Sequence, residues 1–372
     1  MRIGLLTSDL SYKHGWGTYN LSVIKTLQAQ HHDLTILTSS NSEKIDGLTI
    51  HPILPQIAPQ ERGTLLKMIL LRGKVAKLLA NCDVIHTTIE LYAPLVSLIA
   101  GQRPSFMTAH GSYINLPVFR SFPVNQIYKK SFEQHTIICV SHYTQKIAKQ
   151  IVPKAETTVI LNGINANLFS EITPQKADHP NIITVGGVKA RKGTFELVQA
   201  VAKVRETLPD VQCYVLGTLN AEAYYVEKVR SEIKRLNLEN TVHLLGFVSD
   251  DAIQDYYAKA NVFALPSIND RWKFEGFGLA TLEASSAGVA VIGTRDCGAE
   301  DVIEHDETGL LIAQDNIAEE LPQALLKLLT QPDLAQKMGE AGRQKSQTYT
   351  WDNVGRQLSE LYASKLKRMS QD

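Results

Sequence analysis

At 372 residues the chain exceeds the usual size of one compact core and fits two domains of ordinary length. Apolar residues make up 44% of it, which supports globular packing, and 38 basic residues balance 38 acidic ones, which argues against a nucleic-acid binder. Residues 1–170 carry 16 basic and 9 acidic side chains, a net charge of +7, so the remainder carries −7. The positive half predicts an anionic partner, such as a phospholipid surface; an uneven surface without a partner is the alternative.

The four cysteines are scattered, without a Cys-x-x-Cys spacing: Cys82, Cys139, Cys213 and Cys297. This pattern argues against a zinc site or a disulfide framework and fits a reducing cytosol. The N-terminal apolar run reaches polar residues by Thr7, so it is too short for a signal peptide or a membrane span. We therefore expect a cytoplasmic protein that begins with a buried strand.

The first half alternates strand and helix patterns, as doubly wound α/β domains do. A strand over residues 2–7 is followed by a loop over 10–18, which contains Gly15-Trp16-Gly17, and then by a helical pattern. This loop follows the strand where ligands bind in such domains, but it lacks the third glycine and the acidic residue of a dinucleotide fingerprint, so we reject an NAD site. Gly15 and Gly17 remain candidate ligand contacts, with a tight turn as the alternative.

Further strands are predicted over residues 33–38, 48–54, 83–87 and 104–109, with a proline-rich loop over 53–63. His110 follows the last of these strands, so it should point into the crevice at the carboxyl edge of the sheet. A locally bonded loop histidine is the alternative.

An amphipathic, basic helix is predicted over residues 65–80. Such a helix can lie on an anionic membrane, although packing on the sheet is the favoured interpretation. Residues 115–130 show no clean period and are expected to form loops. The first domain should end with strands over 136–141 and 157–161, and a linker is expected over 170–180.

The expected domains are therefore residues 1–170 and 171–350, with a final helix over about 351–372. The second domain opens with a strand over 181–186 and a turn that carries Arg191 and Lys192 into the next helix. Two adjacent cations at a helix N-terminus, which itself favours anions, predict a diphosphate clamp. A solvated basic turn is the alternative.

The most informative stretch covers residues 275–284. Gly276 and Gly278 let the backbone approach a ligand, and the helix that follows offers N–H groups to an anion. Glu283, about a turn into this helix, can accept hydrogen bonds from sugar hydroxyls, while Glu275 can face a second polar group from the loop. The alternative is that Glu283 is an ordinary solvated acid near the start of a helix and that the glycines only make the preceding loop flexible.

The two glutamates, the Gly-Phe-Gly between them and the final Glu-Ala resemble the E-x7-E signature of retaining glycosyltransferases of group 1 (family 4). The resemblance covers nearly the whole chain and is strongest over residues 181–312. It implies an α/β protein of GT-B architecture, with two Rossmann-like doubly wound domains facing each other across a cleft. It also implies sugar transfer from a nucleotide-sugar donor to a glycan, lipid-linked or small-molecule acceptor, in glycan, polysaccharide or glycolipid biosynthesis.

The resemblance also implies roles for individual residues. Arg191 and Lys192 would hold the donor diphosphate, Glu275 and His110 would contact the donor sugar near the reaction centre, and these four are the expected catalytic residues. Glu283 would bind the ribose. The other expected donor contacts lie in the glycine loop, beside the base and at the helix start: Gly15, Gly17, Gly246, Phe247, Val248, Phe277, Gly278 and Leu279.

No Asp-x-Asp pair lies near these loops, so we expect no metal. The resemblance implies a UDP-, GDP- or ADP-sugar as the donor, and the base, the sugar, the acceptor, the linkage and the oligomeric state stay open. The basic first half is compatible with peripheral contact at the inner membrane face. Two alternatives remain: another GT-B enzyme, such as a sugar-nucleotide epimerase or a phosphorylase, and a non-catalytic nucleotide-sugar-binding protein.

Overall fold

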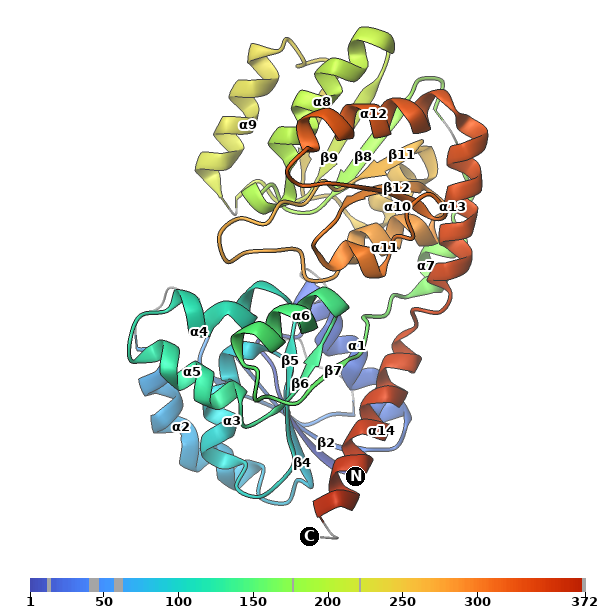
Figure 1. Cartoon of the computed structure of the whole chain (residues 1–372). Coiled ribbons are helices and arrows are strands. Elements are labelled where there is room, and N and C mark those ends of the chain that lie inside the picture. Colours follow the sequence, from blue (N-terminus) through green and yellow to red (C-terminus); the bar gives the residue numbers. More distant parts are fainter. Residues whose placement is uncertain (12–14, 40–46, 57–62, 176, 221, 370–372) are drawn as a thin grey trace. The chain divides into compact units, whose positions relative to one another are not determined.

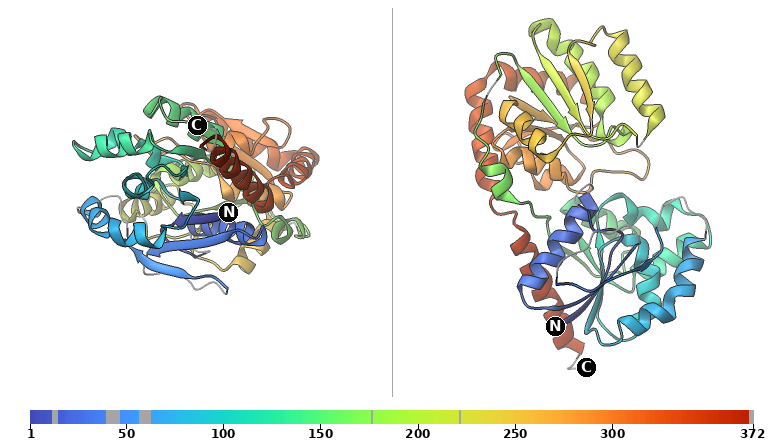
Figure 2. Two further views of the ribbon diagram at one scale, coloured as in Figure 1. Left: turned by 90° about the horizontal axis from the view of Figure 1, so that it is seen from below. Right: turned by 180° about the vertical axis from the view of Figure 1, so that it is seen from behind.

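The computed structural model describes residues 1–11, 15–39, 47–56, 63–175, 177–220 and 222–369. The chain forms two compact units, Met1–Gly163 with Trp351–Asp372, and Ile164–Thr350. Each unit contains one parallel β-sheet covered by helices (Figures 1 and 2). Both units are therefore doubly wound and Rossmann-like, which confirms the predicted α/β class.

The first sheet runs in the order β3-β2-β1-β4-β5-β6-β7, with parallel neighbours throughout. Its strands are apolar runs because helices cover both faces; Ile3, Leu5 and Leu6 are fully buried. The order reverses between β1 and β4, and ligands bind at the carboxyl ends of strands beside such a reversal. The strands are β1 (Arg2–Leu6), β2 (Asp33–Ser39), β3 (Ile50–Leu54), β4 (Val84–Thr87), β5 (Ser105–Ala109), β6 (Thr136–Cys139) and β7 (Thr157–Val159).

Helices cover both faces of the first sheet. The first and last helices, α1 and α14, lie side by side on one face, and α2, α3 and α5 cover the other (Figure 1). The helices are α1 (Gly15–Ala29), α2 (Thr64–Leu78), α3 (Ala93–Ile99), α4 (Leu116–Phe119), α5 (Val124–Phe132), α6 (His142–Ile151) and α14 (Trp351–Met369), with the 3-10 helices η1 (Glu90–Tyr92) and η2 (Ser112–Asn115).

Two local predictions for this unit were wrong. Gly15 and Gly17 lie in the first turn of α1 rather than in a loop. Residues 115–130, expected to be loops, contain α4 and α5. Pro117 lies in the first turn of α4, where proline's fixed φ favours a helix start, and Pro123 is the N-cap of α5. Part of the predicted loop over 53–63 lies outside the described residues.

The C-terminal helix is held to the first sheet by a buried histidine. Nδ1 of His86 on β4 is 2.6 Å from the hydroxyl of Tyr362 on α14, and Nε2 is 2.8 Å from the hydroxyl of Thr108 on β5. His86 and Tyr362 are both fully buried. These bonds satisfy the polar groups of the interface, so α14 is an integral part of the first unit.

Replacing His86 with asparagine should make the first unit less sensitive to acid. Burial lowers the pKa of His86 to about 3 from the ordinary 6.5, so between these values the unfolded chain binds a proton that the folded chain does not. Above pH 6.5 His86 is neutral in both states and does not lower the free energy of unfolding. At pH 5 its protonation in the unfolded chain lowers that free energy by about 2 kcal/mol. Urea unfolding at both pH 7.5 and pH 5 should show a smaller pH effect in His86→Asn than in the wild type; an equal effect would contradict the prediction.

The second sheet has the order β10-β9-β8-β11-β12-β13, again parallel, with its reversal between β8 and β11. On one face α8, α9 and α12 bury the main core, and α10 and α11 lie on the opposite face (Figure 2). The strands are β8 (Asn181–Val185), β9 (Gln212–Leu216), β10 (Val242–Gly246), β11 (Val262–Ala264), β12 (Ala290–Thr294) and β13 (Gly309–Ile312).

The helices of the second unit follow these strands. They are α7 (Ala166–Ser170), α8 (Thr194–Thr207), α9 (Ala223–Arg235), α10 (Asp250–Lys259), α11 (Leu279–Ser286), α12 (Ile317–Thr330) and α13 (Pro332–Ser346), with the 3-10 helices η3 (Ala190–Lys192) and η4 (Gly298–Asp301).

The boundary between the units lies at Gly163 rather than at residue 170. The backbone N–H of Ile164 donates to the carbonyl of Tyr349, so the two chain segments that leave the second unit are adjacent. A linker is expected over residues 170–180, but the described ones, 170–175 and 177–180, belong to the second unit. Ile172 is buried, and the N–H of Gln175 donates to the carbonyl of Ala258.

Candidate active site

Arg191 and Lys192 lie in the turn between β8 and α8, beside the strand reversal of the second sheet. Gly193 ends this turn with a φ of +66° and serves as the N-cap of α8. A Cβ at Gly193 would lie 1.9 Å from the carbonyl oxygen of Pro266, which follows β11. Only glycine permits both this backbone conformation and this close approach, so it brings the two cations next to the end of β11.

Replacing Gly193 with alanine should destabilise the second unit by at least about 2 kcal/mol, because a side chain there both strains the backbone and overlaps Pro266. Gly73 in α2 is the matched control: a Cβ there meets nothing within 4 Å, so Gly73→Ala should be neutral or stabilise by up to about 1 kcal/mol. Urea unfolding of both variants tests this difference. Equal stability of Gly193→Ala and the wild type would refute the close approach.

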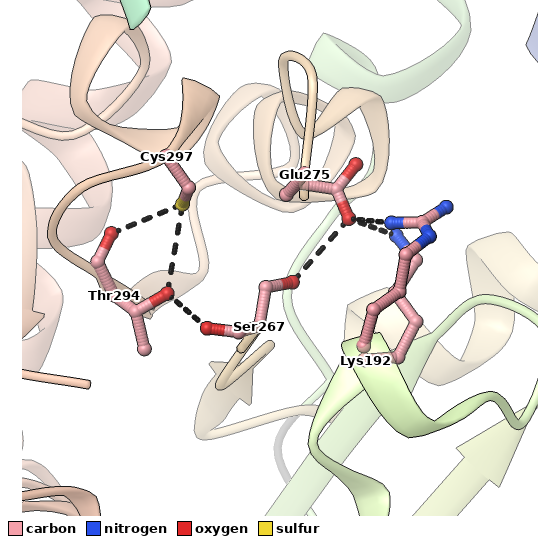
Figure 3. Close-up of polar contacts among 6 residues, drawn as sticks. Lys192, Ser267, Glu275, Thr294 and Cys297 are labelled. Atoms are coloured by element: carbon pink, nitrogen blue, oxygen red, sulfur yellow. Dashed lines mark hydrogen bonds and ion pairs between the residues drawn. The ribbon is translucent and has the colours of Figure 1, made fainter. Parts of the chain in front are cut away.

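Glu275 pairs with both cations (Figure 3). Its Oε2 is 2.7 Å from Nη1 of Arg191 and 2.6 Å from Nζ of Lys192. The side chains of Glu275, Lys192 and Arg191 are 10%, 14% and 24% exposed, so the three charges are largely desolvated while an edge of the group still reaches solvent. The structure therefore brings together three of the four predicted catalytic residues.

The charges determine the protonation state of this group. Burial alone would raise the pKa of Glu275, but the positive charges and hydrogen bonds of Lys192 and Arg191 outweigh it and lower the pKa to about 2. Burial also lowers the pKa of Lys192, against the opposing charge of Glu275. Near neutral pH the carboxylate is ionised, and with Arg191 and Lys192 cationic the group carries a net positive charge that favours an anionic ligand.

A buried network of hydrogen bonds holds Glu275 in place. This network is not evident from the sequence. The hydroxyl of Ser267 donates to Oε2 of Glu275 over 3.3 Å, and the hydroxyl of Thr294 on β12 donates to the carbonyl of Ser267 over 2.6 Å (Figure 3). Cys297 in turn donates to the carbonyl of Thr294. The backbone N–H of Ile268 also donates to the carbonyl of Arg191. The segment after β11 thus fixes the acid and the cations together.

The loop between Ser267 and Glu275 contains a short hairpin. Asp270 and Lys273 exchange two backbone hydrogen bonds, and Nζ of Lys273 is 3.0 Å from Oε1 of Glu222. The other oxygen of Glu222 accepts a hydrogen bond from the N–H of Ala190, the first residue of η3. Glu222 therefore ties the hairpin to the turn that carries the cations, a link that spacing in the sequence could not reveal.

The predicted helix entry after Glu275 is present. Gly278 has a φ of +93° and is the N-cap of α11, which begins at Leu279. Phe277 is buried, and the centroid of its ring is 6.2 Å from that of Tyr349, so its side chain is part of the core. Glu283 lies one turn into α11, half-buried, and its Oε2 accepts a hydrogen bond from Tyr257 over 3.4 Å.

Gly246, Phe247 and Val248 lie at the carboxyl end of β10, the edge strand of the second sheet. The carbonyl of Gly246 accepts a hydrogen bond from Gly217 after β9, and the side chain of Phe247 is 74% exposed. These residues share the carboxyl edge of the sheet with Arg191. Phe247 offers an aromatic face there, which suits a flat ligand group such as a base.

His110 belongs to the first unit, where it follows β5 as predicted. Its Nε2 lies 2.7 Å from the carbonyl oxygen of Thr88. The centroid of its ring is 4.6 Å from the ring centroid of Tyr19 and 6.4 Å from that of Trp16. Burial lowers the pKa of His110 to about 4, so the ring is neutral at pH 7. Because a carbonyl only accepts, Nε2 carries the hydrogen and Nδ1 is an acceptor. The predicted position of His110 opposite Arg191 and Glu275 stays a prediction.

Gly17, in the first turn of α1, has a packing function. A Cβ at Gly17 would lie 1.8 Å from the carbonyl oxygen of Ser11, so glycine allows the segment after β1 to cross the start of α1. Gly15 is exposed at the first position of the helix. This crossing brings Trp16 and Tyr19 to His110, and these two aromatic neighbours are not evident from the sequence.

Within the described ranges, no group of three or more His, Cys, Asp or Glu side chains could hold a metal ion. Among the same residues, no helix is long and apolar enough to cross a membrane. The second unit offers a charge arrangement built from side chains and helix termini: two cations, a paired carboxylate and a second acid on α11. Such an arrangement can hold a diphosphate and stabilise the charge that develops when it leaves.

Comparison with known proteins assigns both halves of the chain to sequence families. Residues 167–345 match the family model described as glycosyl transferases group 1, and residues 14–168 match the model described as glycosyltransferase family 4. A GDP-mannose-dependent alpha-(1-6)-phosphatidylinositol monomannoside mannosyltransferase of Mycobacterium tuberculosis is 26% identical over 309 residues, which cover 77% of this chain and 78% of that protein.

Solved structures show the same fold. Sucrose-phosphate synthase from Thermosynechococcus elongatus has a TM-score of 0.84 at 21% identity, with 99% of both chains covered. The Anabaena protein HepE, solved in complex with UDP-glucose, has a TM-score of 0.77 at 21% identity, covering 98% of this chain and 100% of that one. At these identities the likeness establishes the GT-B class of fold.

Proposed function

Because this chain belongs to the group-1 (family 4) glycosyltransferases, we propose that it transfers a sugar from a UDP-, GDP- or ADP-sugar to a glycan, lipid-linked or small-molecule acceptor, with retention at the anomeric carbon. The observation that carries the proposal is the pairing of Arg191 and Lys192 with Glu275 beside the strand reversal of the second sheet. A relative solved with UDP-glucose and another named as GDP-mannose-dependent support a nucleotide-sugar donor.

In the proposed reaction the bond between the anomeric carbon and the diphosphate oxygen breaks, and its electron pair leaves with the nucleoside diphosphate. Arg191, Lys192 and the start of α8 stabilise this charge. An acceptor hydroxyl forms the new bond to the anomeric carbon, and its proton passes to the departing phosphate. Glu275 and His110 contact the donor sugar, Glu283 binds the ribose hydroxyls, and residues 246–248 lie beside the base.

A ligand panel tests the donor. UDP, GDP, ADP and their glucose or mannose conjugates are added separately, and the melting temperature is measured, because a ligand that binds only the folded form raises it by mass action. One nucleotide class should stabilise the wild type, and Arg191→Ala should lose most of that shift. A panel without any shift, or a shift unchanged in Arg191→Ala, would refute the proposed clamp. The anomeric configuration of the new glycosidic bond in the product, compared with that of the donor by NMR, tests retention.

We also propose that the first unit contacts an anionic membrane surface. The apolar side chains of Leu66 and Leu70 on α2 are 60% and 75% exposed, and that of Phe122, between α4 and α5, is 80% exposed. The helices α2 and α5 cover the same face of the first sheet (Figure 1). The neighbouring charges are basic: Lys67, Arg72, Lys74 and Lys77 on α2, and Lys129 and Lys130 on α5. Exposed apolar groups among cations fit an anionic lipid surface.

Co-sedimentation with phosphatidylcholine vesicles, with and without phosphatidylglycerol, tests this contact. Binding should require the anionic lipid and should weaken with salt and in the double variant Leu70→Ser/Phe122→Ser. Tyr224→Ser is the matched control, because Tyr224 is 89% exposed on α9 of the second unit. Equal binding to both vesicle types, or an equal loss in the Tyr224 variant, would contradict the proposal.

A further inference from the structure

His110 is held at two points by one segment of the chain, the residues that follow β4. The carbonyl of Thr88 accepts a hydrogen bond from the imidazole, as described above. Oε1 of Glu90 accepts a hydrogen bond from the backbone N–H of His110 over 2.8 Å, and the N–H of Gly111 also bonds to this carboxyl group. The side chain and the main chain of His110 are therefore fixed by neighbouring residues of a single segment.

The backbone at this turn needs such support. Gly111 has φ and ψ of 136° and −118°, a conformation that residues with a side chain avoid. Because glycine has many accessible conformations, the backbone of Gly111 alone does little to restrict the conformation of this turn. A buried acceptor that binds two successive N–H groups restricts this turn. It thereby fixes the backbone position from which the imidazole of His110 extends.

Glu90 is an unusual residue to find at this position. Its side chain is fully buried, and its partners in the described part of the chain are backbone N–H groups rather than a basic side chain. Its Oε2 is buried and has no hydrogen-bond partner among the described residues. Burial raises the pKa of Glu90 to about 8. A buried acid without a cation costs stability, so its presence calls for a local function.

We infer that Glu90 is a positioning residue for His110: its carboxyl group fixes the backbone of His110 and Gly111, so that Nε2 reaches the Thr88 carbonyl and Nδ1 remains an acceptor. The inference rests on the proposed function, in which His110 contacts the donor sugar. A misplacement of about 1 Å can lower a rate by about 100-fold, so a positioning residue of this kind matters although it does not touch the substrate.

A double-mutant cycle tests the inference. The variants are Glu90→Met, which keeps the volume and removes the acceptor, His110→Ala, and the two combined. Glu90→Met should lower kcat roughly 10- to 100-fold and leave KM for the donor within about twofold. In the His110→Ala background it should cause no further loss, because its effect passes through the imidazole. Three results would each overturn the assignment. The losses of kcat could be additive in the double variant, Glu90→Met could lower kcat while His110→Ala does not, or Glu90→Met could keep the wild-type kcat.

Two conservative variants separate positioning from folding. Glu90→Gln keeps an acceptor at Oε1 and should retain activity within about threefold, whereas Glu90→Asp keeps the carboxyl group but withdraws it by one methylene and should behave like Glu90→Met. If Glu90→Met does not fold, Glu90→Asp takes its place in the cycle. Equal losses in the Gln and Asp variants would overturn the inference.

A spectroscopic readout is independent of any transfer activity. In uniformly 15N-labelled protein, the His110 ring, assigned by its loss in His110→Ala, should show hydrogen on Nε2 in the wild type and in Glu90→Gln. In Glu90→Asp the ring should show a mixture of tautomers. A wild-type tautomer in Glu90→Asp would overturn the positioning role even if no nucleotide sugar proved to be a donor, so failure of the proposed function and failure of this inference are distinguishable.

Discussion

Replacing Glu275 with glutamine is expected to lower sugar transfer by at least about 100-fold while the diphosphate product binds more tightly than to the wild type. The carboxylate pairs with Arg191 and Lys192 through a single oxygen, so its loss removes the acid that organises both cations. It also removes a negative charge close to where a diphosphate would lie, which reduces repulsion. Initial rates with saturating donor and calorimetric titration of the nucleoside diphosphate measure the two effects.

The same variant should be less stable without ligand. Removing one partner of a buried ion pair costs about 3 kcal/mol, since Lys192 then lacks its counter-charge. Added nucleoside diphosphate should restore more stability to Glu275→Gln than to the wild type, because it supplies the missing anion. The matched control is Glu319→Gln, whose carboxylate pairs with Lys203 on the surface and is 66% exposed. Transfer at the wild-type rate in Glu275→Gln would exclude the proposed role of this acid.

Replacing Arg191 with alanine is expected to lower kcat/KM by roughly 30- to 900-fold, which corresponds to about 2–4 kcal/mol for one donor to a developing charge. Nucleoside diphosphate binding should weaken as well, because the cation would contact the phosphates in the ground state. Arg191→Lys keeps the charge but loses the planar fork, so it should recover only part of the activity. Steady-state kinetics with a fixed acceptor provide the measurement.

Arg205→Ala is the control for this experiment. Arg205 lies at the far end of α8 and donates to the carbonyls of Leu236 and Asn237, so it shares the helix with the clamp but not the site. Its loss should affect stability and leave kcat/KM unchanged. If Arg191→Ala and Arg205→Ala lowered kcat/KM by the same factor, the effect of Arg191 would be one of folding rather than of chemistry.

The local sequence determined the elements of this protein and the position of its motifs along them. Apolar runs such as residues 2–6 and 290–294 are strands because a parallel sheet is covered on both faces, and the glycines at 193 and 278 begin helices because those caps require a left-handed backbone. The paired glutamates and the Gly-Phe-Gly between them also identified the family correctly. Short-range patterns failed at residues 15–17 and 115–130, which contain helical residues, and at the linker expected over 170–180, which belongs to the second unit.

The tertiary structure alone decided which charges meet. Arg191 and Glu275 are 84 positions apart and come together only because β8 and β11 are neighbours at the strand reversal, and Gly193 then lies against Pro266. Glu90 meets His110 in the same way, through the pairing of β4 with β5. No spacing along the chain encodes these contacts, because a strand's partner depends on how all the apolar faces are buried together, whereas a cap or a strand period depends on its immediate neighbours.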